Sequence, residues 1–535
     1  MIEIPVLIVG GGPVGLSLAV ELGWRGVPCI LIEQSDGHIG TPKMNEVNVR
    51  TMEFCRRWGV AEQVMSCPFP DDFPMDAVVV TKLGSYELGR IHRPARKDQQ
   101  PGPFSPMNLQ VCSQIWFDPI MRERAKSFSS VSLLYRHQLE SFEADEDGVT
   151  AKVKDLDNGR EVIFRSRYLA ACDGAGSRIR RSLGINLLGS DVLSSAMHIY
   201  FRARDPLGDL GVKRGTFFAV VDKDGYWGNI RAIDPANGLW RMLFDVPPDF
   251  NPKDIDYDKC LDRAFSKPLY VEWVGASQWT RRGVVAEKFS VGRVHLVGDA
   301  AHQLSPTGGL GMNTGVADAV DLGWKLAAAY EGWAGPHLLE SYSIERQPAC
   351  ARNVKMATKY YEGQAEFREG LEEIDSPTLA GGEVRARVGT KLLAHLTRMF
   401  QTIGLQIGYV YANSPICVGD GTLGPADDAE SYRPSTWPGS RAPHERLSDG
   451  RSTLDLFGRR FVLLRLGDDA PDTKSLEVKA AERGMPLQTI TLQEANVIRT
   501  YERRLVLVRP DGHVAWRGNE MPVNPRELID QVCGG

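Results

Sequence analysis

Three glycines near the N-terminus have the spacing that binds a dinucleotide. They follow the apolar run 4–9, which predicts a β-strand, and precede a helical pattern, a strand at 29–32 and an acidic residue. The first glycine permits a tight turn, the second lets a pyrophosphate approach the backbone, and the third allows close helix–strand packing. The helix start adds free amides, and the acid would accept hydrogen bonds from a ribose. The residues expected to bind are Gly10, Gly12, Pro13, Val14, Gly15, Glu33 and Gln34. A glycine-rich turn without a ligand is the alternative, and the pattern alone does not separate FAD from NAD.

Two further motifs follow predicted strands. The strand 166–172 ends at Asp173-Gly174, and the strand 293–297 ends at Gly298-Asp299. An Asp-Gly pair by itself is usually only a turn. After the second motif, Pro306 and several glycines lead into a helix, whose free amides and positive dipole can stabilise negative charge.

The three motifs occur in the order found in group A flavoprotein aromatic hydroxylases, the para-hydroxybenzoate hydroxylase family, which this sequence resembles. The resemblance implies that the dinucleotide is FAD and that Asp299 binds a ribityl hydroxyl. It also implies that Asp173 lies near the pyrophosphate, and that the Pro306 carbonyl lies near the ring to be hydroxylated. Lys43 stands where relatives often carry an arginine. The further cofactor residues implied in this way are Lys43, Gln114, Asp173, Gly174, Gly298, Asp299, Gly309, Leu310, Gly311, Met312 and Asn313.

The stretch between the second and third motifs predicts a mostly antiparallel sheet, because 197–202, 216–221 and 240–246 alternate with period two. In the family this sheet covers the substrate pocket. Pro306 and Arg281 are the residues we expect at the chemistry, Arg281 as a cation that could lower the pKa of a bound phenol. Candidate substrate contacts are Asn48, Phe218, Tyr226, Trp227 and Arg231, with Arg282 as a second cation. An ordinary core or surface position is the alternative for each.

The C-terminal part resembles the thioredoxin-like domain of phenol hydroxylases. Residues 335–425 predict helices, 432–443 a proline-rich linker, and 460–464 and 504–508 two strands with a helix between them. No CxxC pair is present and Cys533 stands alone, so packing or dimerisation is expected and redox chemistry is not. The expected division is an FAD-binding domain at 1–75, 105–185 and 285–425, a substrate domain at 76–104 and 186–284, and a thioredoxin-like domain at 430–535. The fold class is therefore α/β, with a Rossmann-like FAD domain and an inserted antiparallel sheet.

Bulk composition restricts the partners. The chain has 535 residues, a net charge of −5 and nine dispersed cysteines, which argue against nucleic acid, a disulfide framework and a metal site. Neither a signal peptide nor a membrane span is expected, so a cytoplasmic location is the hypothesis. A homodimer is the expected assembly.

The favoured function is an FAD-dependent monooxygenase that uses NADPH or NADH and O2 to hydroxylate a phenolic compound in aromatic catabolism. The resemblance implies a flavin C4a-hydroperoxide as the oxygen donor. Two alternatives stay open: a monooxygenase of a polycyclic aromatic polyketide, and a flavin-binding redox sensor without catalysis.

Overall fold

The computed structural model describes residues 1–535 and contains three main sheets and one small strand pair. The first sheet has the order β16-β17-β10-β1-β2-β7, and its central strands are parallel. The antiparallel hairpin β8–β9 extends it beside β10. Its strands are β1 (Ile2–Val9), β2 (Cys29–Glu33), β7 (Val131–Tyr135), β8 (His137–Ala144), β9 (Val149–Asp155), β10 (Glu161–Ala171), β16 (Ser290–Val291) and β17 (Val294–Leu296). All three predicted motifs follow strands of this sheet at its carboxyl edge, where open α/β sheets bind their ligands.

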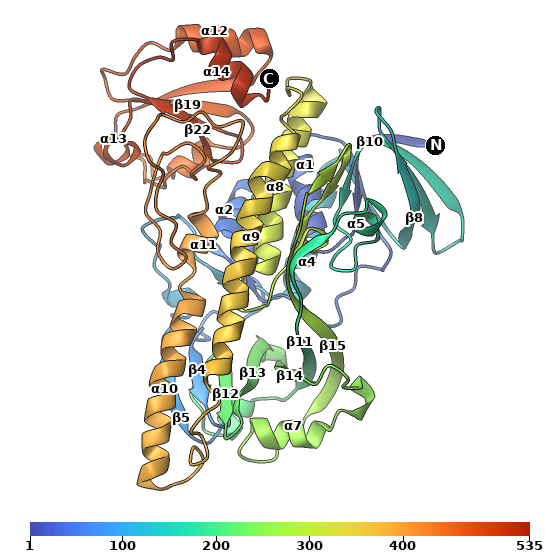
Figure 1. Ribbon diagram of the computed structural model, residues 1–535, viewed down its shortest axis with the longest axis vertical. Coiled ribbons are helices and arrows are strands. Elements are labelled where there is room, and N and C mark those ends of the chain that lie inside the picture. Colours follow the sequence, from blue (N-terminus) through green and yellow to red (C-terminus); the bar gives the residue numbers. More distant parts are fainter.

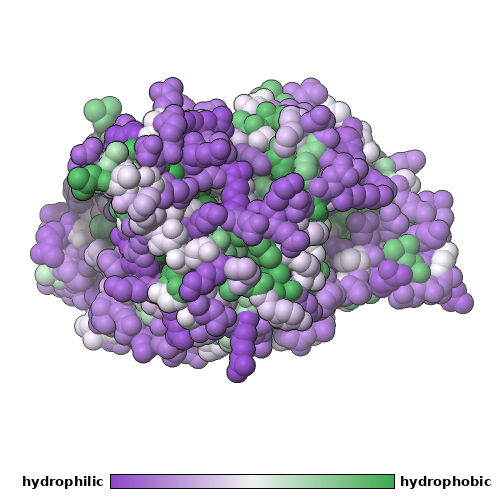
Figure 2. Space-filling view, turned by 90° about the horizontal axis from the view of Figure 1, so that it is seen from below, coloured by the Kyte–Doolittle hydropathy of each residue, from purple (hydrophilic) through white to green (hydrophobic).

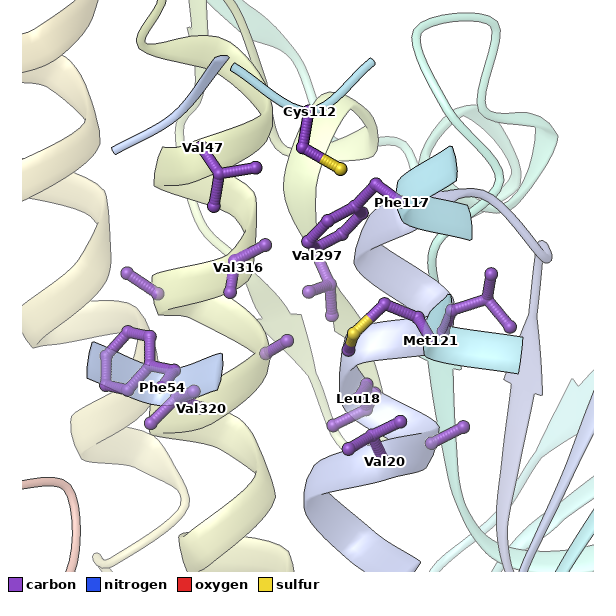
Figure 3. Close-up of a cluster of buried hydrophobic side chains, with 14 of the residues drawn as sticks. Leu18, Val20, Val47, Phe54, Cys112, Phe117, Met121, Val297, Val316 and Val320 are labelled. Carbon is purple, nitrogen blue, oxygen red and sulfur yellow. The ribbon is translucent and has the colours of Figure 1, made fainter. Parts of the chain in front are cut away.

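Helices pack on this sheet and occupy the space between it and the other two main sheets. Two long ones, α8 and α9, pack against each other and run through the upper and middle part of the molecule (Figure 1). The helices are α1 (Pro13–Arg25), α2 (Val49–Trp58), α3 (Ala61–Met65), α4 (Gln114–Lys126), α5 (Arg178–Ser182), α8 (Gly311–Glu331) and α9 (Glu340–Glu362). Apolar side chains from α1, α2, α4 and α8 meet in a core that also receives Val47 and Val297 (Figure 3). This core holds the three motifs in fixed relative positions, because its members are packed from several elements at once.

The second sheet has the order β18-β15-β11-β14-β13-β12-β4-β5 and is antiparallel except where β12 meets β4. It lies at the lower end of the molecule, and α10 packs along its β5 edge (Figure 1). The strands are β4 (Ala77–Val80), β5 (Glu87–Ile91), β11 (Leu187–Arg202), β12 (Phe217–Asp222), β13 (Gly225–Asp234), β14 (Leu239–Val246), β15 (Glu272–Ala286) and β18 (His302–Gln303). The helices beside it are α6 (Pro206–Asp209), α7 (Tyr257–Ala264), α10 (Leu379–Phe400) and α11 (Ile403–Ile407). The three alternating segments all belong to this sheet, so that prediction is confirmed.

The third sheet, of order β20-β19-β21-β22, forms the C-terminal unit, with β19 and β20 parallel and the other pairs antiparallel. Its elements are β19 (Phe461–Leu466), α12 (Lys474–Arg483), β20 (Leu487–Leu492), α13 (Ala495–Tyr501), β21 (Leu505–Val508), β22 (Val514–Gly518) and α14 (Pro525–Val532). The expected single helix between two strands was incomplete, because β20 and a second helix lie there too. The fold class as a whole is confirmed.

The proline-rich segment 432–443 lacks helix and strand but is not a free linker. Arg441 within it is fully buried and donates to both carboxylate oxygens of Glu53 on α2. Buried Arg509 likewise binds Glu345 of α9 and Asp321 of α8. The C-terminal unit is thus held to the helices of the first sheet by buried ion pairs.

The molecular surface seen from the end that carries the second sheet is mostly hydrophilic, with separate hydrophobic patches (Figure 2). No helix combines the length and the apolar character needed to cross a bilayer. All nine cysteines are free thiols, and eight of the nine have a pKa raised by their surroundings, chiefly burial.

Candidate FAD site and substrate cavity

The first motif forms the turn between β1 and α1. Gly10 has a φ of 111°, and a side chain there would collide with the backbone of Cys172. Gly15 lies so close to the carbonyl of Gly10 that no Cβ would fit, whereas a Cβ on Gly12 would meet open space. The second glycine therefore leaves room beside the helix start, which suits a pyrophosphate.

Glu33 lies at the end of β2, beside this turn. Its Oε2 accepts from the amide of Gly11 at 2.7 Å, and its Oε1 accepts from the amide of Ser35 at 2.8 Å. The two amides fix the orientation of the carboxylate, and its remaining lone pairs can accept from ribose hydroxyls. Its contact with the adenosine ribose stays a prediction.

Asp299 in the third motif is a carboxylate without a protein partner. Its side chain is exposed and forms no hydrogen bond in the structure, although the surrounding protein displaces enough water to raise the pKa of the carboxyl. Because Asp299 is exposed and yet surrounded by protein, its carboxylate lines a hollow in the surface. Lys43 lies near enough to act on its charge. These features fit an acceptor for a cofactor hydroxyl.

Asp318 on α8 holds the third motif in place through hydrogen bonds. Its carboxylate accepts from the amide of Gly298 at 3.2 Å, from His302 Nε2 at 2.6 Å and from Arg346 Nε at 2.8 Å. Burial raises the pKa of Asp318, but His302 and Arg346 outweigh it, and the pKa lies below its usual value. Cys350 completes a buried group with metal-like spacing. Because Arg346 already supplies the positive charge, we assign no metal there.

The loop 306–311 begins at Pro306, which is exposed, and ends where α8 begins. The first amides of α8 have no acceptor inside the helix and point out of its N-terminus. Leu310 turns its side chain into an apolar cluster, so its amide alone can serve a ligand. Asn313 uses its side chain to accept from the amide of Asn48 at 2.9 Å and to donate to Gly309 and Glu46 carbonyls. It braces the loop, and only its backbone amide can contact the cofactor.

Gln114 also has a bracing role. Its Oε1 accepts from the amide of Lys43 at 2.9 Å, and its Nε2 donates to Asp118 at 3.0 Å. Burial raises the pKa of Asp118 to about 7. Lys43 itself is exposed, and this contact fixes its backbone. Asp173 has one buried carboxylate oxygen without a partner, and a Cβ on Gly174 would meet open space. The residues of all three motifs thus leave polar atoms and room for FAD, and they fit that cofactor.

One face of the second sheet carries a polar band. Strand pairing places His198 opposite Leu243 and Arg241 opposite both Arg231 and Tyr200, so these polar side chains share one face. Arg241 donates to Asn229 at 3.1 Å but has no carboxylate partner, although the residue is only 9% exposed. Burial and the charges of Arg241, Arg281 and Lys43 lower the pKa of His198 well below its usual value. Because Lys43 also acts on Asp299, the polar band and the third motif face the same region.

The predicted substrate residues divide between two environments. Arg231 and Tyr226 belong to the polar face, and burial raises the pKa of Tyr226 to about 12. Trp227 stacks on Phe244 within the main core, and Phe218 is buried there as well. Neither of these two belongs to the polar band.

Asn48 caps α2 by accepting from the amide of Thr51. Arg281 is buried and reaches the loop through Ser305, while Arg282 pairs with Asp191 near the surface. The roles of these residues toward a substrate stay predictions.

Glu46, His198 and Arg241 are not among the residues predicted from the sequence. The last two do leave a signal, since each is a polar residue inside an otherwise apolar stretch of its strand. Glu46 has no such signal, because its strand is only two residues long.

Comparison with known proteins gives two family matches. Residues 3–357 match the family model described as FAD binding domain, and residues 435–534 match the one described as aromatic-ring hydroxylase, C-terminal. The chain is 31% identical to 4-methyl-5-nitrocatechol 5-monooxygenase from Burkholderia sp, over 99% of this chain and 96% of that one. It is 30% identical to tetracenomycin B2 monooxygenase-dioxygenase from Streptomyces olivaceus, over 99% and 98%. The solved structure of RebC with bound 7-carboxy-K252c is similar at 38% identity and a TM-score of 0.92, covering 100% of this chain and 99% of that one.

Proposed function

The chain belongs to the FAD-dependent aromatic-ring hydroxylases, and on that premise we propose that it hydroxylates a phenolic ring with NAD(P)H as the electron donor. It is a monooxygenase by family, and the redox-sensor alternative therefore loses its support. The observation that carries the phenolic proposal is the polar band facing the loop 306–311. A hydroxylated aromatic ring needs both an apolar slot and a few placed hydrogen-bonding groups.

FAD, when bound, would supply electron transfer from NAD(P)H and the activation of O2. The protein's own residues bind, orient and exclude water. Glu33 would hold the ribose and Asp299 a ribityl hydroxyl. The amides at the start of α8 would stabilise negative charge on the reduced ring system. Gly12 and Gly174 leave the backbone accessible to the phosphates.

The polar band would orient the substrate. Arg241 is a buried cation without a counter-ion, and burying a charge is costly unless it finds a partner. An oxygen of the substrate, as a hydroxyl or carbonyl, would accept a hydrogen bond from Arg241 and supply that partner. Arg231 and Tyr226 would contact the same molecule from β13. Asn48 and Trp227 remain candidate substrate contacts. They are less favoured than Arg231 and Tyr226, because Asn48 caps α2 and Trp227 stacks on Phe244.

A polycyclic aromatic substrate is the second candidate. The RebC structure contains 7-carboxy-K252c, and the Streptomyces olivaceus relative is named for tetracenomycin B2. The Burkholderia relative is named for a nitrocatechol, which is a single ring. The polar band spans β11, β13 and β14, so it could serve a ligand longer than one ring.

The experiment is NAD(P)H oxidation by the FAD-loaded enzyme against monocyclic and polycyclic phenols, with both NADH and NADPH, under 18O-labelled O2. A phenol should accelerate oxidation strongly, and one labelled oxygen should enter its ring ortho or para to the hydroxyl. Oxidation that is indifferent to every phenol, or product without label, would contradict the proposal. Sedimentation of the same preparation tests the homodimer that we also propose.

A further inference from the structure

Glu46 on β3 (Glu46–Val47) places a carboxylate at the loop 306–311. β3 pairs with β6 (Gln110–Val111), and Asn313 of α8 donates to the Glu46 carbonyl at 3.2 Å, so its backbone is fixed. A Cβ built on Gly309 would have a single neighbour within 4 Å, Oε2 of Glu46 at 3.8 Å. Gly309 therefore opens into a space whose nearest wall is this carboxylate.

The two oxygens of Glu46 have different surroundings. Oε1 faces Nη1 of Arg93 and Nη2 of Arg231, each at 3.4 Å. Oε2 forms no hydrogen bond with the protein, although the side chain is only 10% exposed. Both arginines are themselves held, Arg93 over the ring of Phe400 and Arg231 over that of Phe217. One oxygen is thus anchored and the other is free to accept from a ligand.

The charge on Glu46 is stable. Burial raises the pKa of the carboxyl, but Arg93 and Arg231 outweigh burial and bring the pKa below its usual value. These two arginines are the charged groups that face the carboxylate, and Arg241 lies beyond Arg231 on the next strand. A carboxylate that is anchored on one side and ionised at neutral pH is a hydrogen-bond acceptor only.

We propose that Glu46 is a catalytic residue whose free Oε2 accepts the hydroxyl proton of the phenolic substrate during oxygen transfer; this inference rests on the proposed function. As a π electron pair of the ring forms the new C–O bond, the O–O bond of the oxidant derived from O2 breaks, and its electron pair stays with the departing oxygen. The substrate O–H bond breaks at the same time. Its proton goes to Glu46, and its electron pair becomes the C=O bond of a cyclohexadienone. The ring hydrogen then leaves as a proton and the carbonyl oxygen takes one up, which restores the aromatic ring, while the proton on Glu46 passes to the departing oxygen.

The low pKa of Glu46 is compatible with this role. A phenol in its ground state is too weak an acid to give its proton to such a carboxylate. Once the ring has begun to share electrons with the oxidant, positive charge on the hydroxyl makes its proton strongly acidic. A positioned base that acts at this moment accelerates a reaction by about 10²–10⁴-fold. Arg93 and Arg231 keep Glu46 ionised until oxygen transfer begins.

The test compares Glu46→Gln with wild type as FAD-loaded enzymes, with 2-naphthol and resorcinol as probes. The expected kcat is about 100-fold lower in the variant at pH 7. In wild type kcat should be flat with pH across the neutral range, because the carboxylate is already ionised there. In the variant the hydroxyl must first lose its proton to water, so kcat should increase about tenfold per pH unit up to the pKa of the probe.

Binding provides a readout that does not depend on turnover. Without NAD(P)H, wild type should bind 2-naphthol more tightly than 2-methoxynaphthalene, which has no proton to donate. In Glu46→Gln that preference should shrink by about tenfold, because a charge-assisted hydrogen bond is replaced by a neutral one. The matched control is Asp420→Asn, which removes another arginine-paired carboxylate with a mostly buried side chain, bound to Arg517 and not facing Gly309. It should change neither the pH profile nor the preference.

The outcomes separate the two proposals. If wild type oxidises NAD(P)H at the same rate with and without every phenol, the proposed function fails and Glu46 loses its role with it. If wild type responds but Glu46→Gln keeps a flat pH profile and the wild-type preference, the assignment of Glu46 is overturned alone. If Glu46→Gln does not fold, Glu46→Asp replaces it. Its shorter carboxylate should lower kcat while the profile stays flat, and a wild-type kcat would overturn the assignment.

Discussion

Arg281 donates from Nη1 to Oγ of Ser305 over 3.0 Å and so joins the second sheet to the loop that begins at Pro306. The same guanidinium binds Asp245 on β14 at 3.0 Å and Ser194 on β11 at 3.1 Å. Each nitrogen of its guanidinium thus donates within the protein. We therefore expect Arg281 to act as a positioning residue that fixes the distance between the polar band and the cofactor loop.

Replacing Arg281 by Met should therefore disturb the coupling of NAD(P)H oxidation to hydroxylation more than it weakens substrate binding. We expect kcat/KM to fall about 10–100-fold, because a small displacement of reacting groups is costly. More NAD(P)H should be consumed per hydroxylated product, which peroxide release would report. The control is Arg282→Met, whose arginine is adjacent in sequence but pairs with Asp191 near the surface. Equal coupling in the two variants would show that the bridge to Ser305 has no positioning role.

Asp299→Ala should weaken FAD retention by about 1.5–3 kcal/mol, the range for a hydrogen bond to a charged group. The reason is that this carboxylate has no protein partner to lose, so its removal affects only the ligand. Fluorescence of FAD released during dialysis measures the effect. Asp299→Asn keeps an acceptor and should lose less. Unchanged retention in Asp299→Ala would place the ribityl chain elsewhere.

Cys533→Ser should leave turnover unchanged within error. The thiol is buried, and burial raises its pKa to about 12, so thiolate is scarce at neutral pH. No other cysteine lies within 430–535 to form a dithiol with it. The measurement is the steady-state rate of NAD(P)H oxidation and hydroxylation in the variant and in wild type. A large loss of activity with normal thermal stability would mean that the thiol takes part in electron transfer.

Acid should destabilise the protein partly through His513. Burial lowers the pKa of His513 to about 4, and its ring contacts Tyr409 and Tyr411. Because the folded-state pKa is depressed from 6.5, the associated stability is present above pH 6.5 and is lost as the pH falls toward 4. The shift corresponds to at most about 3 kcal/mol. His513→Phe keeps the ring contacts and should flatten the fall of Tm between pH 6.5 and 4.5. An unchanged pH dependence would assign the loss to other groups, such as His295.

Local patterns were enough to predict the FAD motifs. Gly10, Gly15 and Glu33 act within a few residues of the strand ends that carry them, so spacing along the chain defines their geometry. Alternation predicted the second sheet for the same reason, because period two follows from the pleat of a single strand. The segment 487–492 escaped notice because its strand is half exposed and short.

The fold class, the cofactor motifs and the lack of a CxxC pair could thus be predicted from the chain alone. Which side chains are free to act became visible only in the folded protein. Asn313 and Gln114 proved to be braces, Trp227 a core residue, and Glu46 an ionised carboxylate with one free oxygen. The physical reason is that a side chain's availability depends on partners far away in the chain. Arg231 and Arg93 reach Glu46 from other strands or loops, and no sequence pattern near Glu46 predicts these two ion pairs.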